Sequence, residues 1–152
     1  MKGQDAGMRR YNYLLGELEA VYHGISLQMG LSDSISRILY AICDQGDRCP
    51  LSLVCRRTGL TKQTVNSALR RLEEKGLVRL EAVDGRAKEV CFTEEGRALA
   101  DRTARKILEM ENRVLESWAP GEVARYLELT ERFLRSMEQQ AARLEAQGEE
   151  GE

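Results

Sequence analysis

The sequence has little of what membrane, secreted and β-rich proteins require. Its 152 residues include two prolines, two phenylalanines and one tryptophan. No apolar run approaches the roughly 18 residues of a membrane-spanning helix. No hydrophobic block that could act as a signal peptide follows the N-terminal MKGQDAGMRR. Few stretches favour strands, so we expect a cytoplasmic protein with no membrane contact and one mainly α-helical domain.

Cysteine and histidine are too sparse for a metal site or a disulfide framework. The four cysteines, at positions 43, 49, 55 and 91, form no CxxC pair. A reducing cytosol would keep them as thiols, and one histidine does not complete a tetrahedral zinc site. The chain also shows no nucleophile paired with a base and no phosphate-binding loop. We therefore expect neither an enzyme nor a bound cofactor.

Charge is unevenly distributed along the chain. The net charge is −2, yet residues 48–90 hold ten basic and five acidic side chains, a local balance of +5. The rest of the chain has 13 basic and 20 acidic residues, a balance of −7. A basic centre provides affinity for phosphates, while acidic flanks keep the other surfaces soluble. The location of the charge thus permits nucleic-acid binding despite the negative total.

The segment TKQTVNSALRRLEEKGL, residues 61–77, predicts an amphipathic helix ending at Gly76. Apolar residues at positions 65, 68, 69 and 72 form one stripe that faces a core. The opposite face carries side chains that can donate to phosphates or base edges: Lys62, Gln63, Asn66, Ser67 and Arg70. After Gly76 the apolar period changes to two, and Asp84, Gly85 and Arg86 form a turn signal before residues 90–92. A helix followed by a hairpin with a cationic tip is the outline of a winged helix.

Helical spacing extends over most of the remaining chain. We expect helices over residues 4–30, 34–45, 51–58, 94–117 and 121–144, with a loop bracketed by Gly46 and Pro50. Gly59 makes the tight turn between two short helices, which is a helix-turn-helix. The first and last helices have more apolar surface than a small winged domain can cover, so a second copy is the expected cover. The alternative is that these helices pack only within one chain.

Three motifs resemble the MarR family of bacterial winged helix-turn-helix transcriptional regulators. They are LSLVCRRTGLTKQTVNSALRRLEEKGLV, the wing DGRAKEVCFT, and TEEG at residues 93–96, which is similar to the start of the family's helix after the wing. The resemblance is sharpest over residues 34–97. It implies one domain spanning residues 1–152, with a DNA-binding lobe at 34–93 and dimerisation helices at 4–30 and 94–145. One departure is Cys55, which stands where the family usually has alanine.

The resemblance places the helix at residues 61–75 in the major groove of double-stranded DNA. It places Arg86 in the minor groove, steadied by Asp84. From the residues themselves, Lys62 suits a phosphate, whereas the amides of Asn66 and Gln63 suit adenine. Arg70 suits either a phosphate or a guanine. The predicted DNA-binding residues are Lys62, Gln63, Thr64, Asn66, Ser67, Arg70, Arg71, Asp84, Arg86 and Lys88. The alternatives are solvated surface side chains and an ordinary Asp-Gly hairpin.

Relatives in the family commonly bind small aromatic or phenolic effectors between the dimerisation helices and the DNA-binding lobe. The side chains that could line such a cleft are Tyr11, Tyr22, His23, Met29, Tyr40, Met110 and Trp118. The alternative for each is an ordinary core or interface residue, and His23, with its apolar neighbours, would then be interior. Thiol-based sensing is a further possibility. Cys49, in the loop beside Arg48, is the candidate, because the other cysteines fall on buried stripes or in a strand.

The sequence therefore predicts a homodimeric, ligand-responsive DNA-binding regulator, more often a repressor in this family. Two recognition helices related by a dyad fit successive major grooves when they lie about 34 Å apart, so the operator should be roughly palindromic. Two alternatives remain. One is a winged-helix protein-interaction module without DNA binding, and the other is a thiol-based redox regulator.

Overall fold

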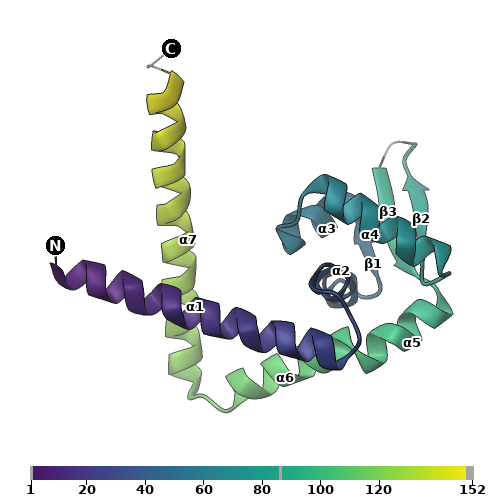
Figure 1. Ribbon diagram of the computed structural model, residues 1–152, viewed down its shortest axis with the longest axis horizontal. Coiled ribbons are helices and arrows are strands. Elements are labelled where there is room, and N and C mark those ends of the chain that lie inside the picture. Colours follow the sequence, from purple (N-terminus) through teal and green to yellow (C-terminus); the bar gives the residue numbers. More distant parts are fainter. Residues whose placement is uncertain (1, 86, 150–152) are drawn as a thin grey trace. The chain divides into compact units, whose positions relative to one another are not determined.

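A computed structural model describes residues 2–85 and 87–149 of the chain (Figure 1). The chain divides into two compact units, Met1–Leu108 and Glu109–Glu152. The elements are α1 (Lys2–Gln28), α2 (Asp33–Asp44), β1 (Arg48–Pro50), α3 (Leu51–Thr58), α4 (Lys62–Glu74), β2 (Val78–Val83), β3 (Ala87–Phe92), α5 (Glu94–Arg102), α6 (Ala104–Glu116) and α7 (Pro120–Glu149). The mainly helical fold with a small β-wing is thus confirmed.

The core of the first unit lies where α2, α3 and α4 meet the sheet. In Figure 1 these helices gather beside the strands, and the hairpin of β2 and β3 projects from the group. Ile38, Leu39 and Ile42 of α2 are fully buried. The expected inner stripe of α4 is buried as well, with relative exposures of 0–3%. Burial of this stripe leaves the opposite face of α4 in solvent.

Hydroxyl caps fix where the helices begin. Thr61 Oγ1 accepts a hydrogen bond from the backbone N–H of Thr64 at 3.1 Å, which satisfies one free donor at the start of α4. Gly59, with φ +64°, ends α3 in the left-handed region that L residues avoid. These two devices give α3 and α4 the short connection of a helix-turn-helix.

The sheet is antiparallel, with strand order β1-β3-β2. We expected a loop between Gly46 and Pro50, and this was wrong, because Arg48–Pro50 pairs with β3 as an edge strand. An edge strand tolerates a terminal proline, because its outward N–H position needs no partner. The register of β2 with β3 runs from the pair Val78 and Phe92 to the pair Val83 and Ala87.

The wing turn follows the expected chemistry as far as the structure describes it. Asp84 has φ +51° and Gly85 has φ +75°, the sign that tight hairpin turns require. The next residue, Arg86, lies outside the described residues. Its predicted contact with Asp84 and its place in the minor groove therefore stay predictions.

The long helix expected over residues 94–117 is two helices in the structure, α5 and α6, with a break at Thr103. Thr103 has φ −130° and ψ −90°, and its hydroxyl donates to the carbonyl oxygen of Leu99 at 2.7 Å. Its side chain is buried, with 3% exposed. A local side-chain hydrogen bond of this kind competes with the helical ladder, which explains a break without proline or glycine.

The start of α5 is clamped to the corner between α4 and β2. Thr93 Oγ1 donates to the carbonyl oxygen of Gly76 at 2.6 Å and accepts from the N–H of Gly96 at 3.0 Å. The N–H of Thr93 also donates to the carbonyl oxygen of Leu77 at 3.1 Å. The TEEG motif therefore both caps α5 and joins the start of α5 to the corner between α4 and β2.

Exposed apolar side chains concentrate on the first and last helices. On α1 these are Met8, Tyr11, Tyr13, Leu14, Leu15, Leu18, Val21, Tyr22 and Leu27. On α7 they are Tyr126, Leu127, Leu129, Phe133, Leu134, Met137 and Leu144. Within the described residues, none of the helices combines the length and apolar character needed to cross a membrane.

Candidate nucleic-acid interface

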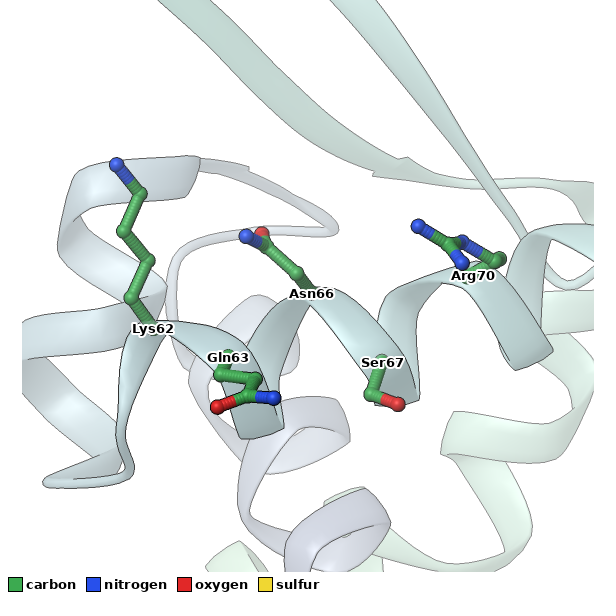
Figure 2. A pocket seen from close by; sticks show the side chains of 5 residues that line it. All are labelled: Lys62, Gln63, Asn66, Ser67 and Arg70. Carbon is green, nitrogen blue, oxygen red and sulfur yellow. The ribbon is translucent and has the colours of Figure 1, made fainter.

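The outer face of α4 gathers five of the predicted DNA-binding residues. Figure 2 shows Lys62, Asn66 and Arg70 projecting as one row, with the remaining two, Gln63 and Ser67, forming a second row beside it. All five are exposed, and they line an open hollow of about 580 Å³. The rows follow from the helical repeat, since residues four apart lie on the same face. Cations stand at both ends of the first row, and an amide stands between them.

These cations are available to an external partner. Lys62, Arg70 and Arg71 make no ion pair with the described part of the chain, whereas Arg48 and Arg79 are held by carboxylates of the sheet. A cation without a protein partner gains most from a phosphate, because no existing pair must be broken. Carboxylates of the sheet thus compensate part of the positive charge of residues 48–90, whereas the cations of α4 are left uncompensated by the described chain.

Thr64 belongs to the helix cap. Its hydroxyl lies 2.8 Å from Thr61 Oγ1, and its side chain is half-buried at the start of α4. A hydroxyl rotates to suit its partners and keeps a second lone pair, so the bond leaves acceptor capacity. The predicted DNA contact of Thr64 stays a prediction.

The two described candidates on the wing are both accessible. Asp84 and Lys88 are exposed, and neither makes an ion pair with the described residues. Lys88 pairs in register with Ala82, close to the tip of the hairpin. An exposed lysine on a narrow β-ribbon can reach a phosphate as a flexible point charge.

Two arginines outside the predicted set of DNA-binding residues stand at the end of α3. Arg56 and Arg57 are exposed in its last turn and have no ion-pair partner in the described chain. In helix-turn-helix proteins the first helix crosses the DNA backbone. Cations at the end of α3 would therefore lie near backbone phosphates. The sequence feature that could have identified Arg56 and Arg57 is their position just before the turn at Gly59.

The predicted effector-binding residues divide between the two units. Tyr11, Tyr22, His23 and Tyr40 belong to the first unit and Trp118 to the second, so their common cleft stays a prediction. The alternative expectation of an interior His23 was wrong. Its Nδ1 lies 2.8 Å from Asp33 Oδ2, and 57% of its side chain is exposed. Trp118 packs edge-on against Tyr126, with ring centroids 5.3 Å apart.

The redox hypothesis required Cys49 to lie in an accessible loop, and this was wrong. It sits in β1 with 0% relative exposure. Burial raises the pKa of its thiol, and the nearby Arg57 guanidinium opposes that shift only in part. Burial likewise raises the pKa of Cys43 and of Cys91. Since the thiolate is the reactive form, these three cysteines are in surroundings that make thiols inert.

Comparison with known proteins agrees with the winged helix-turn-helix fold of the structure. Residues 29–87 match the model of the MarR family. A MarR-family transcriptional regulator from Silicibacter pomeroyi is 28% identical, with a TM-score of 0.66 over 83% of this chain and 86% of that chain. No curated protein sequence gives a significant match.

Two further solved structures share the fold. A MarR-family regulator from Streptomyces coelicolor, solved in complex with DNA, has 19% identity and a TM-score of 0.71 over 90% of this chain and 88% of its own. BpsR from Bordetella bronchiseptica, whose DNA binding is regulated by 6-hydroxynicotinic acid, has 23% identity and a TM-score of 0.60 over 82% and 98%. With the capped helix-turn-helix and the wing, these similarities show a winged helix-turn-helix fold, and residues 29–87 resemble the MarR family.

Proposed function

We propose that the protein is a homodimeric, sequence-specific DNA-binding transcriptional regulator. The observation that carries this proposal is the outer face of α4, where Lys62, Asn66 and Arg70 form an exposed row. Within the described residues, the cations of this face make no ion pair with a carboxylate. A protein with this fold that was solved in complex with DNA supports the proposal of DNA binding.

In this proposal the amides of α4 read bases and its cations bind phosphates. The amides of Asn66 and Gln63 can each pair bidentately with adenine in the major groove, a contact worth about 1–3 kcal/mol of discrimination. Lys62, Arg70 and Arg71 fix the register through phosphates, with Arg70 also able to reach a guanine. Lys88 and the predicted Arg86 extend the contact to the neighbouring groove from the wing.

A second copy of the chain is the proposed cover for the exposed apolar faces of α1 and α7. Sixteen exposed large apolar side chains on these two helices exceed what a soluble monomer normally leaves open. A dimer with two-fold symmetry presents two copies of α4, which fit successive major grooves when about 34 Å apart. The target is therefore an inverted repeat.

Regulation by a small aromatic ligand completes the proposal. BpsR responds to 6-hydroxynicotinic acid, and this chain has Tyr11, Tyr22, Tyr40 and Trp118 as candidates for contacting such a ring. A ligand that binds one separation of the recognition helices more tightly would shift the population toward it. The regulator then acts as a repressor that releases its operator when the ligand binds.

The test is selection of bound duplexes from a random pool, followed by affinity measurement on the selected sequence. Asn66→Ala should relax the preference at one position of each half-site, whereas Lys62→Ala should weaken binding to all sequences alike. Asn112→Ala is the matched control, because this exposed amide on α6 lies outside the proposed interface. Its affinity should equal that of the wild type.

The proposal fails if the wild type selects no sequence. The role of α4 as the recognition helix is refuted if Asn66→Ala, like Asn112→Ala, keeps the sequence preference of the wild type. Sedimentation of the wild type should give twice the chain mass, and a monomer at micromolar concentration would contradict the dimer.

A further inference from the structure

The outer face of the wing sheet holds two carboxylates in direct opposition. Glu81 of β2 and Glu89 of β3 are partners in the antiparallel register. Like charges directly opposite each other destabilise a pair of strands. This sheet nevertheless keeps the pair, because a third strand supplies a cation between them.

That cation is Arg48 of β1. Its Nη2 donates to Glu81 Oε2 at 2.9 Å and to Glu89 Oε2 at 2.9 Å, and its Nε donates to Glu89 at 3.1 Å. One guanidinium therefore joins all three strands of the sheet. These hydrogen bonds also raise the pKa of Arg48, whose guanidinium is charged in proteins in any case.

The two carboxylates depend on Arg48 to different degrees. Glu81 has a second cation, Arg79, at 3.4 Å. Glu89 is paired only with Arg48 within the described residues, and 26% of its side chain is exposed. Loss of Arg48 would thus leave Glu89 as an uncompensated negative charge beside Lys88.

We propose that Arg48 is a positioning residue for the wing. It holds Glu81 and Glu89 in one arrangement and cancels their charge, so that Lys88 and the hairpin tip approach phosphates without repulsion. The inference rests on the proposed DNA-binding function. Arg48 is one of the ten basic residues of the segment 48–90, but in this proposal it does not contact DNA.

The geometry favours this role over a direct phosphate contact. Two of the donor nitrogens of Arg48 are already committed to carboxylates, and a phosphate would have to compete with both pairs. Arg56, Arg57 and Lys62 face no such competition from the described chain. A direct contact and a positioning role also predict different results when the carboxylate is removed together with the arginine.

The experiment compares duplex affinities of Arg48→Met, the double variant Arg48→Met with Glu89→Gln, and Arg79→Met as the matched control. Arg48→Met should weaken binding about threefold to tenfold at low salt, because a repulsive rim charge mainly affects charge-steered association. The double variant restores the local charge balance and should recover most of the affinity. Arg79→Met removes the same single charge but leaves both carboxylates paired with Arg48, so it should weaken binding less than Arg48→Met does.

The outcomes separate the inference from the function on which it rests. If Arg48→Met binds as tightly as the wild type, or if the double variant stays as weak as Arg48→Met, the positioning role is refuted. If the wild type itself binds no duplex, the proposed function fails instead. Thermal unfolding confirms that each variant is folded at the assay temperature, and Arg48→Gln replaces Arg48→Met if the latter is not, with the same expected results.

Discussion

Replacing Gly96 by alanine tests how closely α5 packs on the corner between α4 and β2. An added Cβ would lie 1.8 Å from the carbonyl oxygen of Leu77, 2.8 Å from its carbonyl carbon and 3.3 Å from Phe92 Cδ1. The first two atoms are backbone, so a rotamer change cannot relieve the overlap. The helix start must move away from the corner.

The expected destabilisation follows from three contributions. Overpacking of this kind costs about 1–3 kcal/mol. Movement of α5 also weakens the bonds from Thr93 to Gly76 and Leu77, each worth roughly 1 kcal/mol. Alanine recovers about 1 kcal/mol through its higher helix propensity. The free energy of unfolding should therefore fall by about 2–4 kcal/mol, a melting temperature lower by roughly 5–15 °C at this chain length.

The assay is thermal and urea unfolding followed by circular dichroism at one fixed protein concentration, because dimerisation would make the melting temperature concentration-dependent. Gly24→Ala in α1 is the control, since its Cβ would meet nothing within 4 Å. It should be stabilising by about 0.5–1 kcal/mol. A Gly96→Ala protein as stable as the wild type would refute the close-packed corner.

Three further results are expected. Native protein should react quickly with a thiol reagent at Cys55 alone, because Cys43, Cys49 and Cys91 are buried, and rapid labelling of all four thiols would contradict the core. Burial raises the pKa of those three thiols above their ordinary value of 9.0, so their contribution to stability is present below pH 9 and is lost as the pH rises through the folded-state values. The urea midpoint should therefore fall between pH 8 and pH 10, and less so in Cys49→Ala. Arg86→Ala should weaken duplex binding and leave the sedimentation mass unchanged, and unchanged affinity would refute its minor-groove contact.

The fold was predictable where the local signal agrees with the tertiary contacts. The apolar stripe of α4, the turn at Gly59 and the Asp84-Gly85 turn are short-range features, and the structure confirms the helix-turn-helix and the hairpin that they predicted. The exposed row on α4 followed from the same helical period. Positions of single side chains on a regular element could thus be derived from spacing alone.

The features that could not be predicted depend on residues far apart in the sequence. Strand β1 exists because β3, about 40 residues later, supplies its hydrogen bonds, and the three residues of β1 carry no pattern of their own. Burial of Cys49 follows from that pairing. The break at Thr103 depends on the burial of its side chain, and nothing in the local sequence resembles a breaker. The contact between His23 and Asp33 likewise depends on the turn between α1 and α2.

The salt dependence of duplex binding by the wild type tests the central claim most directly. If unpaired cations of α3, α4 and the wing neutralise phosphates, log affinity should fall linearly with log salt, with a slope of about −0.9 per phosphate contact. Six to ten contacts in the dimer would lower the affinity roughly 10³- to 10⁵-fold between 50 and 200 mM salt. Affinity for the selected duplex that stays flat over this range would contradict the account.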